Sequence, residues 1–371
     1  MGTVASIKLF KNTTLKKRSS NFELLRIISM LFIIAGHFVG QSGMSECYNG
    51  FNFCTFAVLF FESGARAGTL LFLFLGCWFM VDSSFRASKI IKLYSQLWFY
   101  AVIITLILVL VGIDVSLRWK IGSFIPYTSN THWFIRQYLN LMILAPFLKG
   151  CFEWDRTKLK KLLIILFVLI CVVSSIAKFQ NTFIGDLIFF IFTFLFIGYY
   201  KKFVIEPKWL KRSYLLLGVG IYLCMVGIKM FCRLYESGVF HLGELVITQY
   251  ISDFKCLPTF ILCFCIFAFF KNLDLKHKNW INLSARSALA VYIIHQHPVF
   301  YMYLWKDIIR CDSWMGGPYG IVILVVLIPV IYIVCSFIDV IRLKIVEPLW
   351  VSSKLYNIVE IKINQFYKGV V

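Results

Sequence analysis

The segment RIISMLFIIAGHF, residues 26–38, is an apolar run with an arginine at its start and a histidine near its end. On a helix, the eleven steps from Arg26 to His37 make three turns plus about 20° and rise about 16 Å, so both side chains share one face. Glu23 stands three residues before Arg26 and can pair with it. Ionisable groups at membrane depth are costly and usually face protein or a wet cavity. We therefore treat Glu23, Arg26 and His37 as candidate functional residues, although Arg286 and His297 repeat the spacing, which makes spacing alone weak evidence.

The apolar character of this run continues along the chain. Of 371 residues, 60% are hydrophobic and 15% are charged, whereas a soluble domain is nearer half apolar and a quarter charged. Apolar runs recur from residue 21 to about 341 without a polar linker between them. We predict an all-α, polytopic integral membrane bundle of about ten transmembrane helices. Their expected ranges are 21–40, 65–81, 90–111, 132–148, 162–177, 183–200, 214–231, 246–270, 283–305 and 320–341.

One of these ranges is ambiguous. Asp253, Lys255 and Pro258 interrupt the eighth range, so a shorter helix after an interfacial stretch is an alternative there.

The basic residues predict the orientation of the bundle. The formal charge is +20, and 26 of the 38 Lys and Arg residues fall in the segments that alternate to the side of the N-terminus. Such a bias marks the cytoplasmic side, so we expect both termini there. The sequence then divides into a basic N-tail (1–20), one membrane domain (21–341) and a C-tail (342–371) whose mixed apolar and basic residues suit the inner membrane surface. Because the charges lie in short loops, we expect membrane lipids and not nucleic acid as partners, in a multi-pass protein of the plasma membrane.

Four stretches resemble the membrane acyltransferase 3 family. NFELLRIISMLFIIAGHF (21–38) is similar to its first helix, which carries an acidic residue, an arginine, ten residues and a histidine. LLFLFLGCWFM (70–80), THWFIRQYLNLMILAPFL (131–148) and ALAVYIIHQHPVF (288–300) resemble later segments in the family's order. The resemblance covers roughly residues 18–341.

The resemblance implies a ten-helix enzyme that transfers an acyl group, usually from cytoplasmic acetyl-CoA or another acyl-CoA, to a sugar hydroxyl. His37 and Arg26 would take the family's essential positions, with Glu23 beside them. His295 matches the family's Tyr-x-x-His position and would line the cavity.

The family's cytoplasmic Arg-x-x-Arg is only partly matched. In SSFRASKIIKLY (83–94) Arg86 matches, but the second position is Lys89, and Lys92 follows. Lysine holds a phosphate as a point charge and lacks the bidentate fork of arginine. Gly76 and Cys77 also replace the family's Ser-Gly pair. The three basic residues either bind the phosphates of CoA or are ordinary positive-inside anchors.

The remaining roles leave alternatives open. His37 is a general base for the acceptor hydroxyl or a transient acyl carrier, because imidazole titrates near neutrality. Trp133 and Arg136 open the fourth expected helix and either bind the acceptor glycan or lipid-linked saccharide, or belong to the interfacial belt. A transporter or flippase, or a polymerase, for lipid-linked sugars is the alternative function. No residue spacing resembles a metal site, so we expect no metal.

Overall fold

The structure is a computed structural model and describes residues 19–48, 50–128, 132–173, 185–235, 251 and 253–369. Every regular element in these ranges is helical, which confirms the all-α prediction. The α-helices are α1 (Ser20–Ser42), α2 (Met44–Cys47), α3 (Phe53–Asp82), α4 (Ala87–Leu110), α5 (Leu117–Gly122), α6 (Trp133–Leu148), α7 (Arg156–Phe167), α9 (Asp186–Phe203), α10 (Lys208–Tyr235), α12 (Leu257–Asn272), α13 (Asn279–Ser284), α14 (Ala288–His295), α15 (Phe300–Tyr303), α16 (Gly320–Val351) and α17 (Lys354–Phe366).

Several of these helices have the length and composition of membrane spans. Within the described residues, five helices are long and apolar enough: α1, α3, α4, α10 and α16. The other expected spans coincide with shorter helices, namely α6, α7, α9, α12 and α14. The chain is thus a helical protein with several membrane-spanning segments. The number ten and the cytoplasmic placement of the termini stay predictions.

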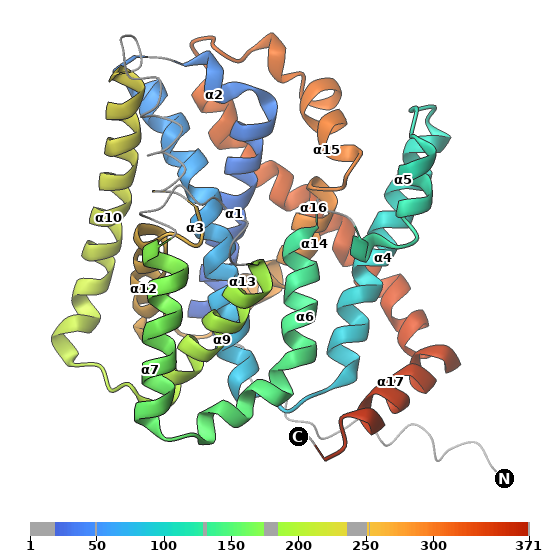
Figure 1. Ribbon diagram of the computed structural model, residues 1–371. Coiled ribbons are helices and arrows are strands. Elements are labelled where there is room, and N and C mark those ends of the chain that lie inside the picture. The colour runs from blue at the N-terminus through green and yellow to red at the C-terminus, as the bar shows by residue number, and fades with distance from the viewer. Residues whose placement is uncertain are drawn as a thin grey trace.

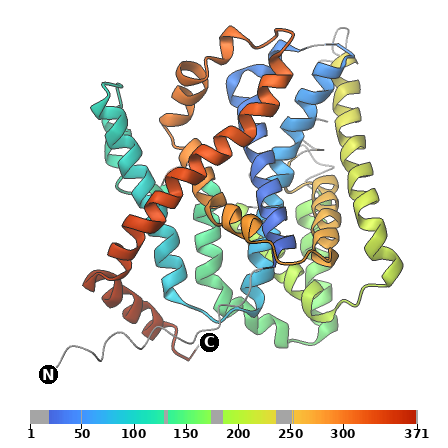
Figure 2. The ribbon, with the colours of Figure 1, turned by 180° about the vertical axis from the view of Figure 1, so that it is seen from behind.

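Helices α1 and α3 lie side by side at the centre of the bundle (Figure 1, Figure 2). Small residues allow their close approach. A Cβ added to Gly68 would lie 2.5 Å from the backbone oxygen of Ser29, and one added to Gly36 would lie 2.1 Å from the Cβ of Ala65. Glycines at the contact between two helices are typical of membrane proteins, because lipid offers no hydrophobic drive for association and the backbones pack directly. This contact fixes α1, and therefore His37, against the rest of the bundle.

The expected ninth helix, 283–305, is not continuous, so that prediction was wrong. Helix α14 ends at His295, and α15 begins only at Phe300. Pro298 lies in the gap, and proline cannot donate the backbone hydrogen bond that a continuing helix needs. The Nδ1 of His297 accepts from the backbone N–H groups of Val299 and Phe300, both at 3.4 Å. His297 therefore provides an acceptor for the backbone N–H groups at the start of α15.

Proline also sets the start of α12. Pro258 occupies the first turn of this helix, which begins at Leu257 and not at residue 246. Proline is well tolerated at this position because the N–H it lacks would have no partner there. The shorter helix of the alternative for the eighth range is observed. The interfacial stretch expected before it falls largely on residues 246–250 and 252, which lie outside the described part.

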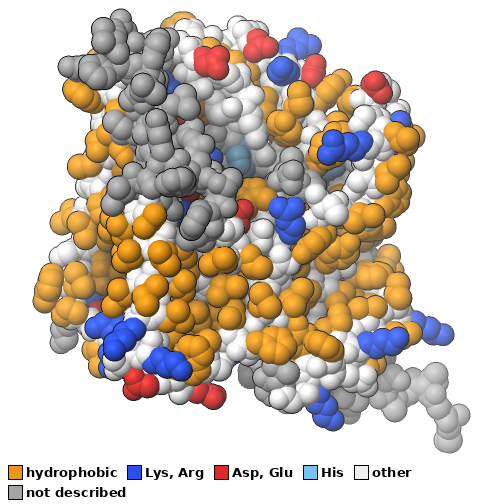
Figure 3. Space-filling model, viewed as in Figure 1, with side chains coloured by type: hydrophobic (Ala, Val, Ile, Leu, Met, Phe, Trp, Pro, Cys, Tyr) orange, Lys and Arg blue, Asp and Glu red, His pale blue; other side chains and the backbone are white. Residues whose placement is uncertain are grey.

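The C-terminal part extends beyond the expected last span. Helix α16 continues past residue 341 to Val351, and α17 then packs against the start of α4 (Figure 1, Figure 2). The face seen in Figure 3 carries a broad band of hydrophobic side chains, with Lys and Arg gathered mainly towards its upper and lower margins. Such a band is the surface that lipid requires.

Candidate active site

Two histidines from distant parts of the chain meet within the bundle. The Nδ1 of His37 on α1 lies 3.0 Å from the Nε2 of His295 on α14, across 258 residues of sequence. The Nδ1 of His295 lies 2.5 Å from the carbonyl oxygen of Val291. A carbonyl can only accept, so His295 donates from Nδ1 and its Nε2 is an acceptor. His37 must then donate from its own Nδ1.

This arrangement leaves the other nitrogen of His37 as a proton acceptor. The Nε2 of His37 carries a lone pair and has no hydrogen-bond partner in the described part of the chain. His295 is fully buried, whereas His37 retains some exposed surface. The pair therefore holds one basic nitrogen, the Nε2 of His37, in a fixed tautomer.

A second polar pair next to the histidines holds the two helices in register. Gln41 and Gln296 exchange side-chain hydrogen bonds of 3.1 and 3.0 Å. The indole N–H of the buried Trp305 also donates to the Gln41 oxygen, at 2.9 Å. Gln41 is one helical turn beyond His37, and Gln296 directly follows His295. The amide pair thus fixes the rotation and height at which the two imidazoles meet.

Aromatic and imidazole rings surround the pair. The ring of Tyr292 lies 6.2 Å from that of His37 and 6.0 Å from that of His132. The Nε2 of His132 is 3.3 Å from the carbonyl of Ile293, to which it donates. The Nδ1 of His132 is buried and has no hydrogen-bond partner among the residues that the structure describes. A third imidazole therefore lies against α14 from the start of α6, where His132 is the N-cap residue.

Glu23 and Arg26 form the expected ion pair, at 2.5 Å. Glu23 is buried, and the side chain of Arg26 is 23% exposed. The charge of Arg26 acts on the hydroxyls of Tyr138 and Tyr332, which lie on α6 and α16. The helix rise places this group about 16 Å from His37, so Arg26 does not contact the histidine pair. Three helices, α1, α6 and α16, instead bring a charged, tyrosine-lined group together in the opposite half of the bundle.

Gly76, one of the two residues that replace the family's Ser-Gly pair, packs directly against Tyr138. A Cβ on Gly76 would lie 2.7 Å from the hydroxyl oxygen of Tyr138. Tyr138 can therefore lie against α3 only because residue 76 has no side chain.

A group of cations gathers where α3 and α9 end and α4 begins; we call this the basic end, defined by Arg86, Lys89, Lys149, Lys201 and Lys202. Arg86 and Lys89 are exposed and have no ion pair with any described residue. Lys149 donates to the backbone oxygen of Ser83. Burial, and next the positive charge of Lys89, lower the pKa of Lys149. Like charges are therefore held together, which favours an anion among them.

Lys92 is placed differently from its two expected partners. Its ammonium pairs with Glu347 on α16, at 3.3 Å. Lys92 thus lies one turn along α4 from Lys89 but already has a counter-charge. Lys201 similarly pairs with Asp82, at 2.6 Å.

The other expected glycan-binding residues lie at the opposite end of α6 from the basic end. Trp133 stacks on Phe254 with ring centroids 5.2 Å apart. Arg136 is half-buried, and its guanidinium has neither an ion pair nor a hydrogen bond with the described residues. Of the nine expected site residues, the structure brings together His37 with His295, Glu23 with Arg26, and Arg86 with Lys89.

Some neighbours of these groups were not anticipated. The charge of Arg66 on α3 reaches His37. Its sequence signal was present, because Arg66 interrupts an apolar run just as Arg26 does. His132 and Lys149 carried no such signal, since a polar residue at the end of an expected span is common.

These features define a class of protein: a helical membrane protein with an imidazole pair inside the bundle and a cation cluster at one end. The family model described as an acyltransferase domain, acyltransferase 3, matches residues 19–337, and the chain belongs to that family. This confirms the resemblance in the four sequence stretches. No curated protein and no solved structure matches the chain.

Proposed function

We propose that the protein is an O-acyltransferase of the plasma membrane. It moves an acyl group such as acetyl from acyl-CoA to a hydroxyl of a cell-surface polysaccharide or of its lipid-linked precursor. The observation that carries the proposal is the hydrogen bond from His37 to His295, found in a chain of the acyltransferase family. It leaves His37, which retains some exposed surface, with a basic nitrogen of defined tautomer.

In the proposed reaction, the Nε2 of His37 takes the proton of the acceptor hydroxyl as the hydroxyl oxygen attacks the thioester carbonyl. The C–O bond of the new ester forms, the C–S bond breaks, and the CoA thiolate leaves with the proton from His37. A positioned base of this kind typically contributes 10²–10⁴-fold to the rate. The imidazolium is stabilised because its Nδ1–H already donates to His295. The same Nε2 would attack the thioester if His37 were an acyl carrier.

The basic end is the proposed donor site. Arg86 can hold a phosphate with two parallel hydrogen bonds, and Lys89 and Lys149 add point charges beside it. Arg86 and Lys89 have no ion pair within the described ranges, which supports this assignment. Lys92 would lie at the rim, because Glu347 already offsets its charge. The acyl end of the donor would pass Glu23 and Arg26 on its way to His37.

The proposed acceptor site is the region around His295, Trp133 and Arg136. The guanidinium of Arg136, which has no partner among the described residues, suits sugar hydroxyls or an acidic sugar. Trp133 offers an aromatic surface beside Phe254.

The test is transfer of labelled acetyl from acetyl-CoA in membrane vesicles, combined with mass spectrometry of the surface glycans. His37→Ala should abolish transfer at normal protein levels, while the exposed His277→Ala serves as the matched control. Wild-type transfer by His37→Ala would show that the catalytic assignment is wrong. Glycans that change in amount or chain length but never carry an ester would instead favour the flippase or polymerase alternative.

A further inference from the structure

The backbone on both sides of Arg86 is held by the C-terminal helix. The side-chain oxygen of Asn364 accepts from the backbone N–H of Ala87 at 3.1 Å, across 277 residues of sequence. The ring of Tyr367 stacks on Phe85, with centroids 3.9 Å apart and 27° between the planes. The family match ends at residue 337, so both contacts come from a part of the chain beyond it.

These contacts supply a hydrogen-bond acceptor that the start of α4 lacks. The first backbone N–H groups of a helix have no partner within the helix, and a Ser, Thr, Asp or Asn at the N-cap normally satisfies one of them. The N-cap of α4 is Arg86, whose side chain forms no capping hydrogen bond. Asn364 provides the missing acceptor from a distance. Arg86 can therefore occupy the cap position without using its guanidinium as a cap.

The same segment is fixed from two further directions. The hydroxyl of Tyr367 donates to the backbone oxygen of Ile143 on α6, at 2.9 Å. Lys149, just after α6, donates to Ser83. The connection between α3 and α4 is thus clamped between α6 and α17. The cations of the basic end gain a common, rigid backbone.

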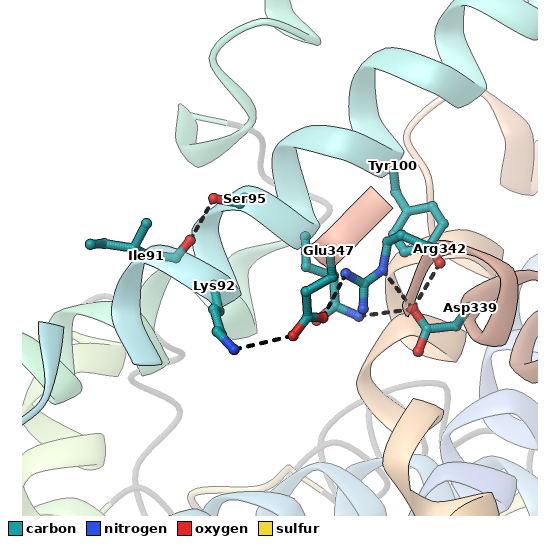
Figure 4. Close-up of polar contacts among 8 residues, drawn as sticks. Ile91, Lys92, Ser95, Tyr100, Asp339, Arg342 and Glu347 are labelled. Atoms are coloured by element: carbon teal, nitrogen blue, oxygen red, sulfur yellow. Dashed lines mark hydrogen bonds and ion pairs between the residues drawn. The ribbon is translucent and has the colours of Figure 1, made fainter. Parts of the chain in front are cut away.

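A buried ionic network holds the end of α16 against α4, and α17 begins directly after it (Figure 4). Asp339 on α16 is fully buried and accepts from the hydroxyl of Tyr100 at 2.9 Å and from Arg342 at 2.8 Å. Arg342 also donates to Glu347 at 3.2 Å, and Glu347 pairs with Lys92. Tyr100 and Lys92 both belong to α4, so the network fastens the end of α16 to α4 directly before α17 begins.

Packing completes the attachment of α17. Tyr356, at 2% exposure, is buried against Ala87 and Ile91. The opposite side of α17 exposes Leu355, Ile358 and Ile361. Only one face of α17 therefore packs against α4.

We propose that Asn364 and Tyr367 are positioning residues for the donor site, which set the backbone of Phe85–Ala87 so that Arg86 and Lys89 together bind the phosphates of acyl-CoA. This inference rests on the proposed function, since it assumes that the basic end binds the donor. It extends that function to a C-terminal element outside the family's domain.

The test is a titration of the purified full-length protein with free CoA, which needs no knowledge of the acceptor. We expect Asn364→Leu to weaken CoA binding about fivefold, the effect of one lost hydrogen bond of about 1 kcal/mol. Tyr367→Leu should weaken binding at least as much, whereas Tyr367→Phe, which keeps the stacking on Phe85, should fall between it and wild type. The matched control is Asn357→Leu, two turns earlier on α17, whose side chain donates to the cap residue Ser353 and to no other described residue.

The fitted number of sites separates positioning from loss of fold. Positioning changes the dissociation constant at an unchanged number of sites, while partial unfolding lowers the number of sites and leaves the dissociation constant of the rest unaltered. Unchanged CoA affinity in Asn364→Leu and Tyr367→Leu, or a loss of sites alone, would overturn the inference. Failure of the wild-type protein to bind CoA would overturn the proposed donor site itself.

Discussion

His37 donates its Nδ1 proton to the Nε2 of His295, 3.0 Å away across the contact between α1 and α14. His295 can accept because its own Nδ1 proton is committed to the carbonyl of Val291. Each of the two imidazoles therefore donates from its Nδ1, His295 to the carbonyl of Val291 and His37 to His295. The lone pair of His37 consequently lies on its Nε2. His295 orients the proposed base and supports its charged form.

The first prediction concerns His295. His295→Ala removes the acceptor for His37 Nδ1–H, so we expect acyl transfer to fall about 10²-fold, within the range of a single general-base contribution. His295→Gln retains an acceptor oxygen and should recover part of that loss. Initial rates with acetyl-CoA in membrane vesicles measure both. Equal rates for wild type and His295→Ala would contradict an orienting role.

The second prediction concerns the amide pair. Gln41→Leu leaves the amide of Gln296 and the indole N–H of Trp305 buried without their partner. Each unsatisfied group costs about 1–3 kcal/mol, so we expect a clearly lower melting temperature in detergent. Gln41→Leu combined with Gln296→Leu should be less destabilising than the sum of the two single changes, because it also removes one orphaned amide. Strict additivity of the two changes would show that the amides are not coupled.

The third prediction concerns the contact between α1 and α3. Gly68→Ala places a Cβ 2.5 Å from the backbone oxygen of Ser29, so the helices must separate. We expect a destabilisation of about 1–3 kcal/mol, the usual cost of overpacking. Gly227→Ala on α10 meets nothing within 4 Å and is the control. It should be neutral or slightly stabilising, since alanine favours helix by up to about 1 kcal/mol. Thermal unfolding in the same detergent compares them, and equal melting temperatures would argue against direct backbone packing.

The fourth prediction concerns the buried network of Figure 4. Arg342→Met leaves the carboxylate of Asp339 buried without its cation, and breaking a buried pair in this way costs about 3–5 kcal/mol. Lys92→Met removes a cation whose side chain is 45% exposed, and such pairs are worth about 0–1 kcal/mol. The yield of folded protein and its melting temperature distinguish the two. A larger loss in Lys92→Met would reverse the ranking and refute the network's proposed role as the anchor of α17.

The fifth prediction concerns pH. Burial, and next the charge of Lys89, lower the pKa of Lys149. An ordinary lysine has a pKa of about 10.4, and Lys149 therefore loses its proton at a lower pH than that. A cation that binds phosphate is effective only while protonated. The affinity for CoA should therefore decline as the pH rises through the lowered pKa, and Lys149→Arg, which stays charged, should shift that decline to higher pH. Identical pH profiles for both proteins would remove Lys149 from the donor site.

Much of the fold could be predicted from the sequence because each apolar run is a local property. The helical class, the first helix and the family followed from residues close together in the chain. The Glu23–Arg26 pair was predictable for the same reason, since three residues on a helix fix the geometry of both partners. The interruption of the ninth range was harder to foresee, because Pro298 in an apolar run can kink a membrane helix or end it.

The pairings that make the candidate site could not be predicted in this way. His37 and His295 were both expected at the site, but the distance between them depends on how α1 and α14 pack. Arg86 and Lys92 were expected to act together, yet Lys92 has its counter-charge on α16. The cap that Asn364 provides for α4 has no sequence signal at all, because donor and acceptor are 277 residues apart.

The sequence by itself determined that this chain is a helical membrane protein of the acyltransferase 3 family, because hydropathy and motif order need no knowledge of contacts. Tertiary structure alone decided which nitrogen of His37 is basic, which cations at the end of the bundle are unpaired, and which helix holds Arg86 in place. These properties depend on hydrogen bonds and charges that act over a few ångströms, and only packing brings their partners within that range.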